Sequence, residues 1–172
     1  NALCLYIPFL KFMVLFVKSD ELVQFQIARN LCMENRKKNK LVQPLLKWAG
    51  GKRQLLKEIR KCFPKRYSTY YEPFLGGGAV LFDVQPKKAF VNDVNSDVIN
   101  VYRVIKEDVN GLIEDLKTHK NESDYYYKIR ELDRSPDFEN LSPLKKASRI
   151  IYLNKTCYNG LFRVNSQGQF NV

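Results

Sequence analysis

The sequence predicts an α/β fold organised around one strand–loop–helix–strand unit, and three observations support this. Residues 68–71 form an aromatic, β-prone run, and three consecutive glycines at residues 76–78 follow it closely. Residues 79–84 are an apolar segment of helical character, and residues 89–91 are a second short strand-like run that ends just before Asp93. This order of elements is typical of nucleotide-binding α/β proteins.

The glycine loop and Asp93 indicate which kind of ligand such a unit would hold. Glycine tolerates positive φ and leaves room for a ligand against the backbone. Asp93 lies 17 residues after Gly76, where an acid can accept hydrogen bonds from ribose hydroxyls. NAD and nucleoside triphosphates are disfavoured, because Leu81 replaces the third glycine of a dinucleotide fingerprint and no GxxxxGK(S/T) motif occurs. S-adenosylmethionine, which has a ribose but no phosphates, fits better. A glycine turn that only tightens a strand–helix junction is the alternative.

The net charge of +11 is unusually basic for 172 residues, a length that suits one domain. Residues 35–66 contain twelve Lys or Arg and one acid, and residues 142–172 contain five and no acid. Residues 107–139 reverse the balance, with ten acids and five bases. Such segregation favours a basic face that binds a polyanion such as double-stranded DNA, although solubility alone is another explanation.

The cysteines and the histidine predict no metal site. The four cysteines (Cys4, Cys32, Cys62 and Cys157) include no CxxC pair, and His119 is the only histidine. We therefore expect free thiols in a reducing cytoplasm. His119 lies among charged residues, which predicts a solvated surface position.

The first 32 residues are expected to lie outside the functional domain. Residues 2–17 are largely apolar, but this run includes Lys11 and is shorter than the roughly 20 residues that span a bilayer. It also lacks the basic region and the cleavage site of a signal peptide. Because Met33 opens a sequence that looks like a natural start, we expect residues 1–32 to be a non-native extension or upstream translation. No membrane association is expected.

Residues 44–62 predict a second glycine-bearing loop that leads into a helix. Gly50 and Gly51 lie between Trp48 and Lys52, and apolar residues then recur at helical spacing. A helix N-terminus beside a lysine suits an anion, such as the carboxylate of a methionyl group. Equally, Trp48 could be a core aromatic and Lys52 a solvated side chain.

The second half of the chain predicts a helical subdomain that interrupts the strand–helix alternation. Asn95 or Ser96 can cap one helix, and Ser142, followed by a proline, can start another. Two acidic helical stretches are expected between them, at residues 112–118 and 123–132.

Residues 154–172 predict a basic loop and hairpin. Asn159 and the glycine after it signal a turn, and residues 166–168 can form another, so residues 161–164 would be a short exposed limb. Arg163 on this limb could read a base, since Arg is the usual bidentate partner of guanine O6 and N7. An ordinary basic hairpin is an equally good interpretation.

Four blocks of these residues together resemble the N-terminal part of the Dam-type, DpnII-like, DNA adenine-N6 methyltransferases. The blocks are PLLKWAGGK (residues 44–52), YEPFLGGGAVLF (71–82), VNDVN (91–95) and NKTCYNGLFRVNSQGQFNV (154–172). Their order over residues 33–172 is far more specific than any one block alone.

The resemblance implies a Rossmann-like S-adenosylmethionine-dependent methyltransferase core with an inserted helical DNA-recognition subdomain. Residues 33–106 would be the cofactor-binding part, and residues 107–172 the target-recognition subdomain and hairpin. The implied reaction is methyl transfer to adenine N6 in duplex DNA, in GATC for much of the family, with a restriction endonuclease as a genetic rather than physical partner. The implied cofactor-binding residues are Trp48, Lys52, Glu72, Phe74, Gly76, Gly78 and Asp93, and the implied DNA-binding residues are Lys155, Tyr158, Asn159 and Arg163.

The resemblance is incomplete in one respect. The family's Asp-Pro-Pro-Tyr motif, which holds the flipped adenine and its amino group, does not occur in these 172 residues. We therefore assign no catalytic residue within the chain and expect it to be inactive alone. A non-catalytic DNA-binding module and an RNA or protein methyltransferase are the alternatives; cofactor binding argues against the first, and the block around residues 158–163 against the second.

Overall fold

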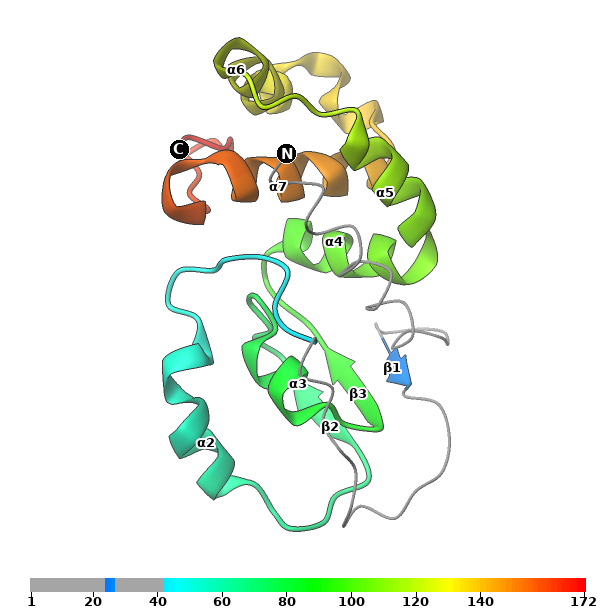
Figure 1. Cartoon of the computed structure of the whole chain (residues 1–172), viewed down its shortest axis with the longest axis vertical. Helices are drawn as coiled ribbons and strands as arrows, with labels where there is room; N and C mark the ends of the chain where they lie inside the picture. The colour runs from blue at the N-terminus through cyan, green and yellow to red at the C-terminus, as the bar shows by residue number, and fades with distance from the viewer. Residues whose placement is uncertain (1–23, 27–41) are drawn as a thin grey trace.

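The computed structural model describes residues 24–26 and 42–172, which form two parts that lie one above the other (Figure 1). A small sheet with two short helices occupies the lower part of the view, and longer helices occupy the upper part. The expected extension at residues 1–32 and the start at Met33 lie outside the described residues, apart from Gln24–Gln26.

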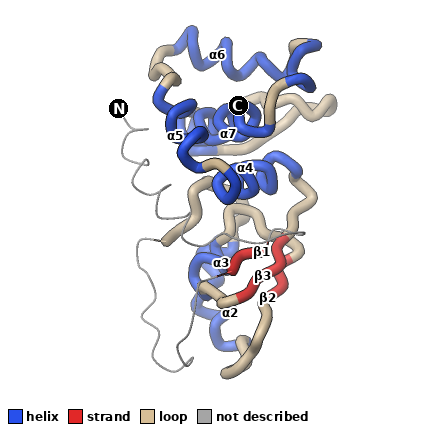
Figure 2. Tube along the Cα trace, turned by 90° about the vertical axis from the view of Figure 1, so that its right-hand side faces the viewer, coloured by secondary structure: helices blue, strands red, loops and turns tan. Residues whose placement is uncertain are grey.

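The described sheet has three strands in the order β1–β3–β2. β2 (Tyr70–Glu72) and β3 (Lys88–Val91) run parallel, and β1 (Gln24–Gln26) pairs antiparallel with the other edge of β3. α3 (Ala79–Val84) connects β2 to β3, and Figure 2 shows it against one face of the sheet. The predicted strand–loop–helix–strand unit is therefore confirmed.

The carboxyl ends of β2 and β3 lie side by side, because Glu72 pairs with Val91. Hydrogen bonding continues past the strands: Asn92 N–H donates to the Glu72 carbonyl at 2.9 Å, and Leu75 N–H donates to the Asn92 carbonyl at 2.8 Å. The two loops that follow the strands are thereby held together. This is the edge of a parallel sheet where ligands bind in open α/β folds.

The helical segment predicted after the second glycine loop is also present. A 3₁₀ turn (Lys52–Leu55) continues into α2 (Leu56–Cys62), which lies beside α3. Arg60 of α2 joins the two helices, because its Nε donates to Asp83 Oδ2 of α3 at 2.7 Å.

The upper part consists of four helices with predicted capping residues at two of their ends. The Asn95 side chain accepts from Val98 N–H at 3.1 Å, and Ser142 Oγ accepts from Lys145 N–H at 3.3 Å. Both are N-caps of the kind that stabilises a helix by about 1 kcal/mol. The helices are α4 (Ser96–Glu107), α5 (Val109–Lys117), α6 (Ser123–Glu131) and α7 (Pro143–Thr156), with 3₁₀ turns at Leu132–Arg134, Pro136–Asn140 and Tyr158–Gly160.

One hydrophobic core continues from the sheet into the helices. α4 and α7 pack against each other, and the buried apolar residues of α4 and of residues 147–151 in α7 belong to the same cluster as Leu45, Leu75 and Ala89 of the lower part. Tyr102 of α4 also contacts the Phe82 ring of α3, with ring centroids 5.8 Å apart. The predicted division at residue 106 therefore falls within a shared core, and the inserted subdomain stays a prediction.

The expectation that His119 is a solvated surface group is wrong. His119 is half-buried and stacks on Tyr152 with ring centroids 4.5 Å apart. Its Nε2 lies 2.9 Å from Ser148 Oγ, and its Nδ1 lies 3.0 Å from the Tyr125 hydroxyl. Burial lowers the pKa of the imidazole. The charged neighbours in sequence misled the prediction, because the ring turns away from them toward α7.

Candidate functional site

A cavity of about 510 Å³ lies at the carboxyl ends of β2 and β3. Its walls come from residues 43–53, from the glycine loop, from Asp93 and from Lys155 of α7. This volume is in the range of small-molecule sites, about 300 to 1,000 Å³. The cavity therefore has the size and the position that a ligand site in an α/β fold requires.

Asp93 joins the end of β3 to the glycine loop. Its Oδ2 accepts a hydrogen bond from Gly76 N–H at 2.7 Å, and its Oδ1 accepts one from Asn95 N–H at 2.9 Å. Each oxygen thus holds one backbone donor, and a carboxylate oxygen can accept two. The carboxylate fixes the loop and keeps hydrogen-bonding capacity on the cavity side.

The glycine loop is packed so closely that side chains would not fit on it. A Cβ at Gly76 would lie 3.1 Å from Trp48 Cδ1, and one at Gly77 would lie 2.9 Å from the Leu46 carbonyl oxygen. Gly78 precedes α3 with φ of 77°, a left-handed conformation that glycine adopts most readily. Glycine is therefore favoured here because it lets Leu46 and Trp48 pack against the loop, while Gly76 and Gly77 also line the cavity.

Tyr102 supports the loop from behind. Its hydroxyl donates to the Gly77 carbonyl at 2.8 Å, and the side chain is 1% exposed. Burial raises the pKa of this phenol, so it remains a donor at neutral pH. α4 thus holds the loop in a fixed conformation, which reduces the ordering cost of binding a ligand there.

Partly exposed Lys52 forms an ion pair with buried Glu72 beside the cavity. Lys52 Nζ lies 3.2 Å from Glu72 Oε1 and also donates to the Phe74 carbonyl. Glu72 is 5% exposed, and neither carboxyl oxygen makes a hydrogen bond of ordinary geometry within the described residues. Burial raises the pKa of this carboxyl, while the Lys52 ammonium opposes the rise. A buried acid of this kind next to a cavity marks a candidate functional site.

Lys155 lies in the cavity wall rather than on an open basic surface. Its Nζ donates to the Leu45 carbonyl, and the side chain is half-buried. Burial, together with the nearby Lys47 charge, lowers the pKa of Lys155 to about 8. Its contact with DNA stays a prediction, and the structure places the residue among those that line the cavity.

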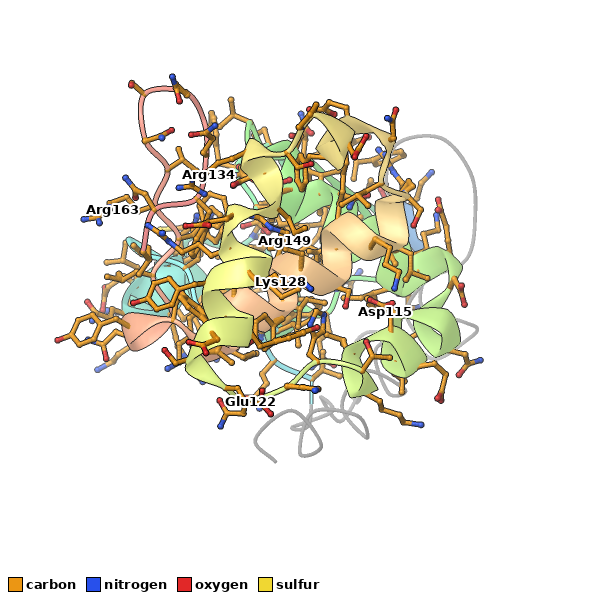
Figure 3. All side chains as sticks on the ribbon, turned by 90° about the horizontal axis from the view of Figure 1, so that it is seen from above. Asp115, Glu122, Lys128, Arg134, Arg149 and Arg163 are labelled. Atoms are coloured by element: carbon orange, nitrogen blue, oxygen red, sulfur yellow. The ribbon has the colours of Figure 1, made fainter. Side chains whose placement is uncertain are left out.

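The predicted loop and hairpin lie after α7. The Tyr158 side chain is 75% exposed, and Asn159 takes a left-handed conformation with φ of 53°. Val164 pairs with Phe170 across the predicted turn, which forms the hairpin. Figure 3 shows Arg163 at the outer edge of the molecule, away from the packed helices.

The guanidinium of Arg163 is held by the other limb of this hairpin. Its Nε donates to Asn171 Oδ1 at 2.8 Å and its Nη2 to the Asn171 carbonyl at 3.0 Å. The remaining N–H groups leave the exposed guanidinium able to bind a phosphate or a base edge.

Asn154 is a site-forming residue that the sequence analysis missed. It is 2% exposed, and its Oδ1 accepts from Lys47 N–H at 2.9 Å. Its Nδ2 donates to the carbonyls of Lys47 and Gly160, at 2.9 and 3.0 Å. Asn154 therefore links α7, the cavity wall and the loop before Arg163. The sequence did offer a signal, because Asn154 follows a run of apolar residues in the expected helix and is the first residue of the block at residues 154–172.

The structure brings most of the predicted cofactor-binding residues together. Glu72 and Gly78 lie outside the cavity wall, the first behind Lys52 and the second at the start of α3. Of the predicted DNA-binding residues, Lys155 of α7 lines the cavity, whereas Tyr158, Asn159 and Arg163 lie outside it. The predicted residues that line the cavity are Trp48, Lys52, Phe74, Gly76 and Asp93.

Two features are absent from residues 24–26 and 42–172. No group of three or more His, Cys, Asp or Glu side chains there could hold a metal ion. No helix in this part of the chain is long and apolar enough to cross a membrane.

Comparison with known proteins gives a family match for most of the chain. A family model described as D12 class N6 adenine-specific DNA methyltransferase matches residues 48–172. The chain is 46% identical over 138 residues to the Type II methyltransferase M1.LlaDCHI of Lactococcus lactis subsp. cremoris, covering 78% of this chain and 49% of the relative. It is 42% identical over 149 residues to the Type II methyltransferase M.MjaIII of Methanocaldococcus jannaschii, covering 76% and 51%.

A third relative is a DNA adenine methylase of Haemophilus influenzae, 40% identical over 136 residues, covering 76% of this chain and 46% of the relative. The chain spans about half the length of the curated relatives it matches.

Proposed function

The chain belongs to the D12 class N6 adenine-specific DNA methyltransferases, and we propose that its cavity binds S-adenosylmethionine and its basic loop binds duplex DNA. The proposed reaction of the whole protein is transfer of the cofactor's methyl group to N6 of an adenine. The cavity is the observation that supports this most directly. It lies at the carboxyl ends of two parallel strands, and its lining includes the glycine loop, Lys52 and Asp93.

The cavity residues fit a ligand with a ribose and an amino-acid end. Asp93 has one acceptor site left on each oxygen for a ribose hydroxyl. Lys52 brings a positive charge suited to a carboxylate, and Glu72 behind it keeps that charge in place. When bound, S-adenosylmethionine supplies a methyl group activated by its sulfonium. The chain's own residues bind and orient it.

Phe74 suits the flat part of such a cofactor. It is 73% exposed although it lines the cavity. An exposed ring beside a cavity can cover a purine by offset stacking. We assign this role to Phe74, with the glycine loop on the other side.

Duplex DNA is the proposed substrate because the exposed loop after α7 carries Tyr158, Asn159 and Arg163 with no acid between residues 142 and 172. Arg163 would read a guanine, and GATC is the first sequence to test. A cognate restriction endonuclease would be a genetic partner. Action on cellular DNA would take place in the cytoplasm.

The methyl transfer itself requires groups that hold the flipped adenine, and the 172 residues contain no Asp-Pro-Pro-Tyr. We therefore expect these 172 residues to bind both ligands without methylating DNA.

Binding measurements on the chain test this proposal. S-adenosylhomocysteine, the demethylated product, is titrated by calorimetry, and a GATC duplex is titrated by fluorescence anisotropy at fixed salt. Binding of both ligands supports the proposal. Binding of DNA without cofactor would favour a non-catalytic DNA-binding module, and binding of cofactor without duplex DNA would favour a methyltransferase that acts on RNA or protein.

A further inference from the structure

A buried joint, formed by Asn154 with Lys47 and Gly160, connects the proposed cofactor site to the proposed DNA site. Asn154, near the C-terminal end of α7, forms hydrogen bonds to both backbone groups of Lys47, which lines the cavity. The same amide donates to the Gly160 carbonyl, two residues after Tyr158. A single side chain therefore fixes the cavity wall and the DNA-facing loop to one helix.

A second contact links the same two segments. The Trp48 ring stacks on the Phe162 ring with centroids 4.9 Å apart and an interplanar angle of 28°. Trp48 covers Gly76 of the glycine loop, while Phe162 directly precedes Arg163. A ligand that moves Trp48 thus acts on the neighbour of the residue proposed to read DNA.

The backbone at Gly160 packs closely against Lys47. A Cβ at Gly160 would lie 2.5 Å from Lys47 Cδ, and the residue has φ of +67°. The loop before Arg163 is therefore packed directly on the segment that lines the cavity. Close packing of this kind favours discrete arrangements over continuous deformation.

From these contacts we propose that Asn154 is a positioning residue for both sites, and that its joint with Lys47, Gly160 and the Trp48–Phe162 stack couples cofactor binding to DNA binding. The inference rests on the proposed function, since it needs both ligands. By linkage, each ligand changes the affinity of the other by the same factor. The Asn154 hydrogen bonds and the Trp48–Phe162 stack supply this coupling, because a shift of one binding surface is transmitted through them to the other.

The test measures the dissociation constant of S-adenosylhomocysteine for the chain with and without a saturating GATC duplex. The ratio of the two constants is the coupling factor, and known couplings correspond to about 5- to 150-fold. We expect at least about fivefold tighter cofactor binding with DNA in the unmodified chain. Asn154→Ala should bring the ratio close to one.

Two further variants separate positioning from general stability. Phe162→Leu keeps an apolar side chain but removes the ring stack, so it should lower the ratio while the chain still unfolds cooperatively. Asn100→Ala is the matched control, because Asn100 Nδ2 also donates to a backbone carbonyl, that of Pro143, at the opposite end of α7. It should leave the ratio unchanged.

The outcomes are distinguishable. If Asn154→Ala does not fold, Phe162→Leu decides the question. An unchanged ratio in a folded Asn154→Ala or Phe162→Leu variant overturns the inference, as does a ratio of one in the unmodified chain that binds both ligands. If the unmodified chain binds neither ligand, the proposed function fails as well.

Discussion

The Asp93 carboxylate accepts the N–H of Gly76 at 2.7 Å, and this bond joins the segments after two parallel strands into one wall of the cavity. Asp93 thus has two tasks, since it shapes the glycine loop and faces the proposed ribose position. An Asp93→Asn variant cannot serve both backbone donors in the same way, because its amide has one acceptor oxygen.

Glu72→Gln should weaken cofactor binding without lowering stability. The folded-state pKa of Glu72 is raised by burial, so its contribution to stability is present below its ordinary pKa of 4.5 and is lost as pH rises through the folded-state pKa. The substitution removes a buried ionisable group, so stability should not fall. It also removes the counter-ion of Lys52, so cofactor binding should weaken. Urea unfolding at pH 5 and pH 7, together with calorimetric titration, checks both effects.

Glu58→Gln is the matched control for that experiment, because Glu58 pairs with Lys61 on the exposed face of α2 at 2.7 Å. It should change neither stability nor cofactor affinity measurably. Equal cofactor affinity in Glu72→Gln and the unmodified chain would refute the assigned role of Glu72.

Gly77→Ala should destabilise the fold and abolish cofactor binding. The added methyl would lie 2.9 Å from the Leu46 carbonyl oxygen, so the loop or the cavity wall must shift. Overpacking of this kind costs about 1 to 3 kcal/mol. Gly168→Ala is a comparison variant, since nothing lies within 4 Å of its Cβ position and only its positive φ opposes substitution. Thermal unfolding and cofactor titration should separate the two, and normal cofactor binding by Gly77→Ala would count against the site.

Lys155→Met should remove a pH dependence of stability. The folded-state pKa of Lys155 is lowered to about 8 from an ordinary value of 10.5. Between these values the unfolded chain holds a proton that the folded chain has lost, so this lysine makes folding more favourable as pH rises. The unfolding free energy of the unmodified chain should therefore rise relative to Lys155→Met between pH 7 and pH 10.

The exposed Lys57→Met variant provides the reference for that comparison. If the difference in unfolding free energy between the unmodified chain and Lys155→Met stays constant over this pH range, the buried position of Lys155 is contradicted.

We also expect Lys155→Met to weaken cofactor binding more than it changes the salt dependence of DNA binding, because Lys155 lines the cavity.

Arg163→Ala should reduce discrimination between DNA sequences. Loss of a bidentate base contact costs about 1 to 3 kcal/mol against the correct base. Arg163→Lys keeps the charge but not the planar fork that Asn171 holds in place, so it should keep most of the non-specific affinity and still lose discrimination. Anisotropy titrations with GATC and single-base variants measure this, and equal weakening toward all duplexes would remove the base-reading role.

Local signals in the sequence were sufficient for the elements around the glycine loop. The glycines, the capping residues Asn95 and Ser142 and the apolar periodicity act over a few residues, so the strands and helices they predict are present with small changes in their ends. The acid at the end of β3 was likewise predictable, because its position follows from the strand before it.

Contacts between distant segments could not be predicted in the same way. The positions of His119 and Lys155 depend on which face of α7 meets the rest of the chain, and neither neighbouring charge nor spacing encodes that. The bonds from Asn154 to Lys47 span 107 residues. Such long-range pairings arise from tertiary packing, which a single sequence read by local pattern does not contain.

The most direct test of the account is a crystal structure of the chain with S-adenosylhomocysteine. We expect the nucleoside against the glycine loop, with a ribose hydroxyl within about 3 Å of an Asp93 carboxylate oxygen. A nucleoside bound elsewhere, or a ribose out of reach of Asp93, would contradict it.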